Sequence, residues 1–98
     1  MTDRTSPEVT DSGAAPGFRR GVRFRFDDVR GAWVLLMPEK LFLPDDIAVE
    51  ILKLVDGARP LEAIVDDLAA RFDAPRETIA ADVTEVLQDL ANRGAVQL

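Results

Sequence analysis

The side chains best suited to acid–base chemistry in this sequence form three pairs of adjacent aspartates: Asp27-Asp28, Asp45-Asp46 and Asp66-Asp67. Acid–base catalysis requires two groups held in different environments, so that their pKa values separate. Neighbouring side chains in a helix or a strand point in different directions, and the last pair falls opposite the apolar positions of a predicted helix. We therefore expect solvated carboxylates and no catalytic residue.

The residue types that most enzymes of this size depend on are missing. The chain has no cysteine, histidine or tyrosine, which excludes disulfide scaffolds, thiolate and imidazole chemistry, and metal sites of the usual Cys/His kind. It also lacks the glycine-rich phosphate loops and the GxSxG motif. A chain of 98 residues is one domain with at most a tail. We expect a binding protein without a metal or cofactor, not an enzyme.

Charge is distributed unevenly along the chain. Residues 1–17 carry a net charge of −2, residues 18–40 carry +3, and residues 41–98 carry −7, within a total of −6. One interpretation is two solvated faces of opposite sign. The other is that each face attracts a different partner.

Residues 1–17 are rich in Ser, Thr, Pro, Gly and Ala and hold one larger aliphatic residue, Val9, after Met1. Such a segment buries too little apolar surface to offset the entropy of ordering, so we expect a disordered tail or a linker, followed by one folded domain over residues 18–98. The segment has no apolar region typical of a signal peptide, and no apolar run approaches a membrane span. These observations favour a cytoplasmic protein that does not enter a membrane.

Three strands are expected first. Apolar and basic residues alternate over Val22–Phe26, which is typical of a strand with one buried face. The continuous apolar run Ala32–Met37 predicts a central strand buried on both faces, and Pro38 ends it. A short third strand over Lys40–Leu43, closed by Pro44, is expected at the edge of the sheet.

Three helices are expected next. Asp45 or Asp46 caps the first, which is predicted to end at Asp56-Gly57. Pro60 starts the second at its first helical position, and Asn92–Gly94 ends the third. Each helix has an apolar stripe. The stripes are Ile47, Ala48, Ile51, Leu52, Leu54 and Val55; Leu61, Ile64, Val65, Leu68 and Phe72; and Ile79, Val83, Val86, Leu87 and Leu90.

The order of these elements predicts an α+β fold of the winged helix-turn-helix type, in which a three-stranded antiparallel sheet precedes three helices. Ala95–Leu98 is apolar enough to pack back as a final extended segment. Winged helices commonly bind DNA through their last packed helix. Here that helix has a net charge of −2, with Arg76 and Arg93 against four acidic residues. Because affinity for DNA depends on neutralising phosphates, a DNA-binding regulator is the weaker alternative.

Peptide binding has a direct physical route in this sequence. An edge strand at Leu41–Leu43 beside the third helix would form a groove with one wall of backbone groups and one apolar wall. An extended peptide can add a strand at such an edge. The alternative is that Leu41, Phe42 and Leu43 simply belong to the core, as one face of any strand in a sheet must.

The residues also resemble a known family. Trp33–Glu39 reads WVLLMPE, Ile51-Leu52 is followed by Asp56-Gly57, and Asp82-Val83 is followed by Leu87 and Leu90. This combined spacing, WVLLxPE, ILxxxDG and DVxxxLxxL, is similar to that of the PqqD family of pyrroloquinoline quinone (PQQ) biosynthesis. The resemblance covers about residues 18–98.

The resemblance implies a peptide chaperone with a winged-helix fold, a recognition element for ribosomally made and modified (RiPP) precursor peptides. It implies binding of the precursor peptide PqqA, presentation of PqqA to the radical SAM enzyme PqqE, and association with PqqC, to which some members are fused through a linker like residues 1–17. It places the peptide against the third strand and beside the third helix, and it leaves open which side of that helix lines the groove. The implied peptide-binding residues are Lys40, Leu41, Phe42, Leu43, Asp82, Val83, Val86, Leu87 and Leu90.

Overall fold

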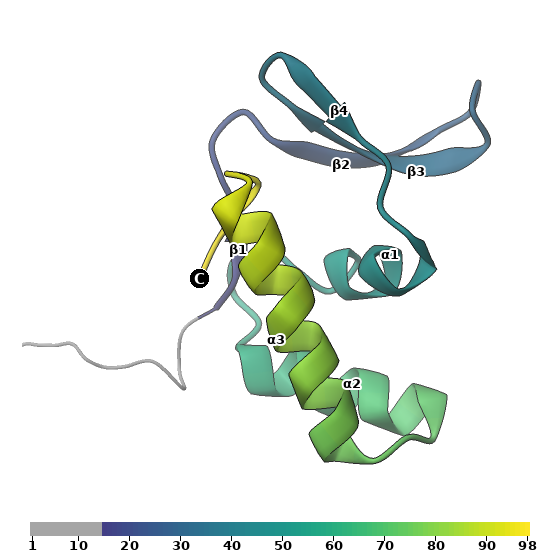
Figure 1. Ribbon diagram of the computed structural model, residues 1–98, viewed down its shortest axis with the longest axis vertical. Coiled ribbons are helices and arrows are strands. Elements are labelled where there is room, and N and C mark those ends of the chain that lie inside the picture. The colour runs from purple at the N-terminus through teal and green to yellow at the C-terminus, as the bar shows by residue number, and fades with distance from the viewer. Residues whose placement is uncertain (1–14) are drawn as a thin grey trace, which may run out of the picture.

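The computed structural model describes residues 15–98 and places a three-stranded sheet beside three helices (Figure 1). Most of the expected tail, residues 1–14, lies outside the described residues. Pro16 is buried and its carbonyl oxygen accepts a hydrogen bond from Gly57 N at 2.9 Å. Gly17–Phe18 forms the short strand β1. The folded part of the chain therefore begins before Phe18, within the segment assigned to the tail.

The sheet consists of β2 (Arg23–Asp27), β3 (Ala32–Met37) and β4 (Lys40–Phe42), all antiparallel in the order β2-β3-β4. Three strands form where expected, with β3 central and β4 at the edge; β2 lies one residue later than the predicted Val22–Phe26, and β4 ends at Phe42 and not at Leu43. Val34 and Leu35 point to opposite faces and are 1% and 0% exposed. The interpretation of β3 as a strand buried on both faces is correct at its centre.

Pro38 and Glu39 make the turn between β3 and β4. Glu39 has a φ of +66°, so the turn resembles type II, with Pro at the first central position and a left-handed second residue. The turn leaves Met37 opposite Lys40, Leu36 opposite Leu41 and Leu35 opposite Phe42. Pro38 ends β3 as expected, and it also starts the hairpin that creates the edge strand.

Helix α1 (Asp46–Leu52) begins where the sequence predicts and ends earlier. Asp45 is its N-cap, and the Asp45 carboxylate accepts a hydrogen bond from Ala48 N at 2.8 Å. The predicted end at Asp56-Gly57 is wrong. After Leu52 the backbone hydrogen bonds span three residues: Leu54 N donates to the Ile51 carbonyl, and Val55 N donates to the Leu52 carbonyl. Hydrogen bonds with this spacing are common in the last turn of a helix. Gly57 N donates to the Pro16 carbonyl and not to a carbonyl of α1.

Helices α2 (Leu61–Phe72) and α3 (Arg76–Asn92) match their predicted spans. Pro60 is the N-cap of α2 and not its first helical residue. Asp73 has a φ of +51°, which ends α2 in a left-handed cap. Of the predicted stripes, Ile64, Val65, Leu68, Val83, Leu87 and Leu90 are buried.

Two members of the apolar stripes do not reach the core. Ile47 is 60% exposed and Phe72 is 53% exposed. Ile47 lies in the first turn of α1 and Phe72 in the last turn of α2, where a helix can extend past the elements that cover its middle. Both residues line a surface hollow.

The final segment packs back onto the domain, as expected. Ala95 and Val96 are 0% and 1% exposed. β5 (Val96–Gln97) pairs antiparallel with β1, with Phe18 opposite Val96. Arg19 N also donates to the Ala95 carbonyl at 3.0 Å. The two ends of the described chain therefore hold each other beside the end of α3 (Figure 1).

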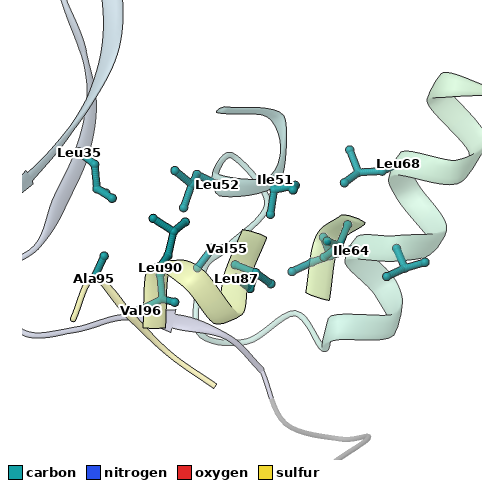
Figure 2. Packing of buried hydrophobic residues seen from close by; sticks show 12 residues of the cluster. Leu35, Ile51, Leu52, Val55, Ile64, Leu68, Leu87, Leu90, Ala95 and Val96 are labelled. Atoms are coloured by element: carbon teal, nitrogen blue, oxygen red, sulfur yellow. The ribbon is translucent and has the colours of Figure 1, made fainter. Parts of the chain in front are cut away.

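The core lies between the three helices, the Ala95–Val96 segment and one residue of the sheet. Figure 2 shows Leu35 of β3 directed toward Leu52 of α1 and Leu90 of α3. Phe24, Met37 and Phe42 pack at the margin of this cluster and are partly buried. No helix within residues 15–98 has both the length and the apolar character needed to cross a membrane.

An ion pair joins α1 to α2 at the surface. Arg71 Nη2 lies 3.2 Å from Glu50 Oε1, and Lys53 Nζ lies 3.3 Å from Glu50 Oε2. Burial alone would raise the pKa of Glu50, but the hydrogen bonds and charges of Lys53 and Arg71 lower it below its ordinary value of 4.5. A lowered carboxyl pKa stabilises the folded state above the ordinary pKa, and the effect is lost as the pH falls through the folded-state value.

Removing the cap of α1 should weaken the whole domain. Asp45→Ala is expected to lower the free energy of unfolding by about 1 kcal/mol, because it leaves the N–H of Ala48 without its partner. Asp46→Ala, which removes only a favourable charge in the first turn, should cost about 0.3 kcal/mol. Urea unfolding followed by circular dichroism compares the two variants, and equal losses would contradict the capping role.

Replacing Glu50 should make stability depend on pH in a defined direction. Glu50→Gln is expected to lower the free energy of unfolding by about 0.5 kcal/mol near neutral pH, a value typical of partly exposed ion pairs. The difference from the wild type should shrink as the pH falls below 4.5, where the wild-type carboxylate is progressively protonated. Unfolding curves across this range provide the measurement. Glu85→Gln, which makes the same exchange at an exposed position of α3, serves as the control.

Candidate peptide-binding groove

The end of β4 and helix α3 lie on either side of a surface groove. The groove has a volume of about 880 Å³ and is lined by residues from β4, the start of α1 and the length of α3. We call it the β4–α3 groove. Its lining residues are Phe42, Asp45, Ala48, Ala80, Ala81, Thr84, Glu85, Val86, Gln88, Asp89, Leu90 and Asn92.

Small side chains keep the groove open. Ala48 of α1 and Ala80, Ala81 and Thr84 of α3 stand along its walls. Residues three and four apart share one face of a helix, so Ala80, Ala81 and Thr84 present a shallow strip on α3. Phe42, which is half-buried, supplies the large apolar surface. This arrangement leaves room for side chains that this chain does not itself provide.

Arg93 covers Phe42 at the end of α3. Its guanidinium lies 4.9 Å from the centre of the Phe42 ring, and Arg93 Nε lies 2.9 Å from Asp89 Oδ2. A cation over an aromatic face is attracted by the ring quadrupole. Because both Phe42 and Asp89 line the groove, Arg93 holds the ring and the carboxylate in place together.

The groove is acidic. Its lining contains Asp45, Glu85 and Asp89 and no lysine or arginine. The Asp89 carboxylate is paired with Arg93, which leaves Asp45 and Glu85 as the groove's outward negative charges. A ligand with apolar side chains and a positive charge fits this lining better than an acidic one.

Next to the groove, β4 has an open edge, and Phe42 is the residue of β4 that lines the groove itself. Met37 and Lys40 flank a two-residue turn, so they form a hydrogen-bonded pair, and the next pair, Leu36 and Leu41, does not exchange hydrogen bonds. The N–H and C=O of Leu41 therefore point to the open side of β4. Leu41 is 42% exposed, and no strand among residues 15–98 covers this edge.

The structure divides the predicted site residues into groups. Phe42, Val86 and Leu90 line the groove. Lys40 and Leu41 lie exposed on the edge strand. Val83 and Leu87 are each 1% exposed in the core and support α3 from below. Leu43, Asp82 and Val83 line a separate hollow on another side of α1.

Sequence reasoning missed the small and polar residues of the groove. Most of the residues expected on α3 belong to its apolar stripe, of which Val83, Leu87 and Leu90 lie in the core, whereas the groove side of α3 is mostly small and polar. The signal for this wall was present in the sequence as alanine, threonine and glutamine on the other side of α3. The missed residues are Asp45, Ala48, Ala80, Ala81, Thr84, Glu85, Gln88, Asp89 and Asn92.

The aspartate pairs have structural roles. Asp27 Oδ1 accepts from Val29 N at 2.9 Å in the β2–β3 turn, and Asp45 caps α1. Asp66 lies 2.7 Å from Arg76, and Asp67 lies 2.9 Å from Arg71. Within residues 15–98, Asp and Glu side chains do not gather in a group of three that could hold a metal ion.

Comparison with known proteins points to one family. Residues 32–96 match the profile of the family described as coenzyme PQQ synthesis protein D (PqqD). A protein named PqqA binding protein from Rhodopseudomonas palustris (strain BisB5) is 50% identical over 90 residues, covering 91% of this chain and 88% of that protein. The bifunctional coenzyme PQQ synthesis protein C/D of Methylorubrum extorquens (strain ATCC 14718 / DSM 1338 / JCM 2805 / NCIMB 9133 / AM1) is 41% identical over 91 residues. These residues are 93% of this chain and 24% of that longer protein.

The fold has a counterpart of known structure. The solution structure of the PqqD truncation of Methylobacterium extorquens PqqCD, described as a functional and stand-alone RiPP recognition element, superimposes with a TM-score of 0.72. It is 42% identical, and the match covers 91% of this chain and 96% of that one. The profile match over most of the folded residues and these relatives agree with the resemblance in the sequence, and the chain belongs to the PqqD family.

Proposed function

We propose that this protein binds the precursor peptide PqqA in PQQ biosynthesis and presents it to the radical SAM enzyme PqqE, without catalysing a reaction itself. The open edge of β4 beside the β4–α3 groove carries this proposal. A relative 50% identical is named PqqA binding protein, and a structural relative is described as a RiPP recognition element. Both names agree with a protein that holds a peptide.

The peptide would add a strand to β4. Its backbone would bond to the outward N–H and C=O of Leu41, between the flanking residues Lys40 and Phe42. Each such hydrogen bond contributes about 1 kcal/mol, so the edge alone gives weak binding. The edge fixes the direction and register of the peptide, since main-chain bonds are the same for any sequence.

Side chains of the peptide would supply most of the affinity and the selectivity. Alternate residues of an added strand point toward α3, where Phe42, Val86 and Leu90 form an apolar surface between the alanines. Burying one aliphatic or aromatic side chain there contributes about 1.5–3 kcal/mol. Val83 and Leu87 would not touch the peptide but would hold α3 in place from the core side. The carboxylates of Asp45 and Glu85 would favour a basic residue of the peptide next to its apolar side chains.

The arrangement of sheet and helices is, in this proposal, a winged-helix fold used for a peptide and not for DNA. The two arginines at the ends of α3 are both occupied: the Asp66 carboxylate raises the pKa of Arg76, and Arg93 pairs with Asp89. The remaining charges of α3 are acidic. A helix of this kind repels a phosphate backbone.

The PqqC/D relative supports a role beside PqqC as well. This chain matches 24% of that bifunctional protein, so PqqC and PqqD work there as one polypeptide. We include association with PqqC in the proposal. The acidic, proline-containing segment that precedes Pro16 would then serve as the connecting segment.

Removing the edge donor should remove PqqA binding. Leu41→Pro is expected to lower the affinity for PqqA by at least tenfold, because proline has no N–H and its ring blocks the approach of a second strand. The outward N–H of Leu41 is not used within the sheet, so the domain should stay folded. Isothermal titration with PqqA measures the loss. Leu41→Ala, which keeps the N–H, should bind within about threefold of the wild type, and full-strength binding by Leu41→Pro would contradict the edge assignment.

A bulky side chain on the α3 wall of the groove should also weaken PqqA binding. Thr84→Trp places a large ring at an exposed position that lines the groove, and we expect at least a tenfold loss of PqqA affinity. Thr78→Trp makes the same change at an exposed position of α3 outside the groove and should leave the affinity within about twofold. Equal effects of the two substitutions would show that PqqA binds elsewhere.

A further inference from the structure

A second apolar surface lies on another side of α1, away from the β4–α3 groove. This hollow, which we call the α1 hollow, has a volume of about 780 Å³ and lies among the β2–β3 hairpin, α1, the end of α2 and the start of α3. Among residues 15–98, seven large hydrophobic side chains are exposed, and four of them line it: Phe26, Leu43, Ile47 and Phe72. Exposed apolar residues gathered at one place mark an interaction surface.

A fixed tryptophan stands at one wall of the hollow. Trp33 stacks on Phe24 with ring centres 4.7 Å apart and meets the edge of Phe26 at 5.8 Å. Lys53 Nζ lies over the Trp33 ring at 5.4 Å. These contacts hold the ring in one orientation while it remains partly exposed. Rigid, partly exposed tryptophans are typical anchors of protein–protein interfaces.

The two surfaces use different faces of the same helices. On α1, Ala48 lines the groove, whereas Ile47 and Glu50 line the hollow; on α3, Thr84 lines the groove, whereas Asp82 lines the hollow. The lining residues of the two surfaces do not overlap. A peptide in the groove therefore leaves the hollow open to a second molecule.

The rim of the hollow is negatively charged. Its lining contains Asp46, Glu50 and Asp82 against Lys53, a net charge of −2. Glu50 is paired with Lys53 and Arg71. Within residues 15–98, Asp46 and Asp82 take part in no ion pair, and both are exposed. Positive charges of a partner would complement these two carboxylates.

We propose that the α1 hollow is the docking site for the enzyme that receives the peptide, and that it takes an amphipathic helix with lysine or arginine beside its apolar face. A helix presents apolar side chains at three- and four-residue intervals, which suits a hollow with Trp33, Ile47 and Phe72 spread along it. The inference rests on the proposed function, since it names the surface used toward PqqE. With both surfaces occupied, one small domain would hold the peptide and the enzyme together.

The test compares substitutions of equally exposed apolar residues. Ile47→Gln and Phe72→Gln should each weaken the complex with PqqE by at least tenfold, measured by biolayer interferometry on the full chain under anaerobic conditions. Leu98→Gln removes a side chain of similar exposure, 54% against 53% for Phe72, outside the hollow, and should change the affinity less than twofold. Affinity for PqqA should stay within about twofold in all three, with thermal melting as a second check of folding.

A charge variant separates the basic helix from a purely apolar partner. Asp46→Asn combined with Asp82→Asn should weaken PqqE binding at low salt and reduce its dependence on salt concentration. An unchanged salt dependence would overturn the proposed basic character of the partner.

The possible results distinguish this inference from the proposed function. If PqqE binds all three glutamine variants as it binds the wild type, or does not bind the wild type, the hollow is not its docking site, whereas PqqA binding by the groove is judged by its own titration. If the glutamine variants instead lose a dimer seen in the wild type by sedimentation, the occupant is a second copy of this chain and the assignment is overturned. If Ile47→Gln or Phe72→Gln loses PqqA binding and keeps PqqE binding, the hollow belongs to the peptide site and the assignment is overturned.

Discussion

The fold depends on how little of the sheet reaches the core. Leu35 is the one residue of β2, β3 and β4 in the fully buried cluster, where it meets Leu52 and Leu90 (Figure 2). Phe24, Met37 and Phe42 pack only at its margin. The helices and the Ala95–Val96 segment complete the core without the sheet covering them fully. Because so few side chains attach the sheet to the core, surface space stays open on both sides of α1.

Those two spaces are the β4–α3 groove and the α1 hollow. The groove combines an unpaired strand edge with an apolar wall, and the hollow combines exposed apolar side chains with an acidic rim. A larger domain would cover such surfaces with further elements. Helix α1 is the element that separates the two surfaces.

The acidity of the chain has a consistent place in this arrangement. Arginines at the helix surfaces pair with aspartates and glutamates, as in Arg71 with Glu50 and Asp67 and in Arg76 with Asp66. Of the carboxylates outside these pairs, Asp45 and Glu85 line the groove, and Asp46 and Asp82 line the hollow. The basic residues Arg23 and Arg25 stand on β2, on the sheet face that α1 does not cover. The sign of the charge therefore changes between the helices and the sheet, as the two blocks of charge in the sequence indicate.

The sequence by itself determined the elements whose signals are local. Strict alternation marked β2, the apolar run marked β3, and caps, prolines and glycines marked α2, α3 and the start of α1. The tertiary structure decided what depends on distant residues. The segment after α1 is tied to the start of the folded chain, since Gly57 N donates to the Pro16 carbonyl, and β1 exists because β5 returns to it. Ile47 and Phe72 have the spacing of core residues, yet they lie outside because no other element covers the helix ends that carry them. Periodicity tells which side chains share a helix face, but only packing tells whether anything stands against that face. For the same reason the sequence indicated an edge strand beside α3, and only the structure showed which side of α3 lines the groove.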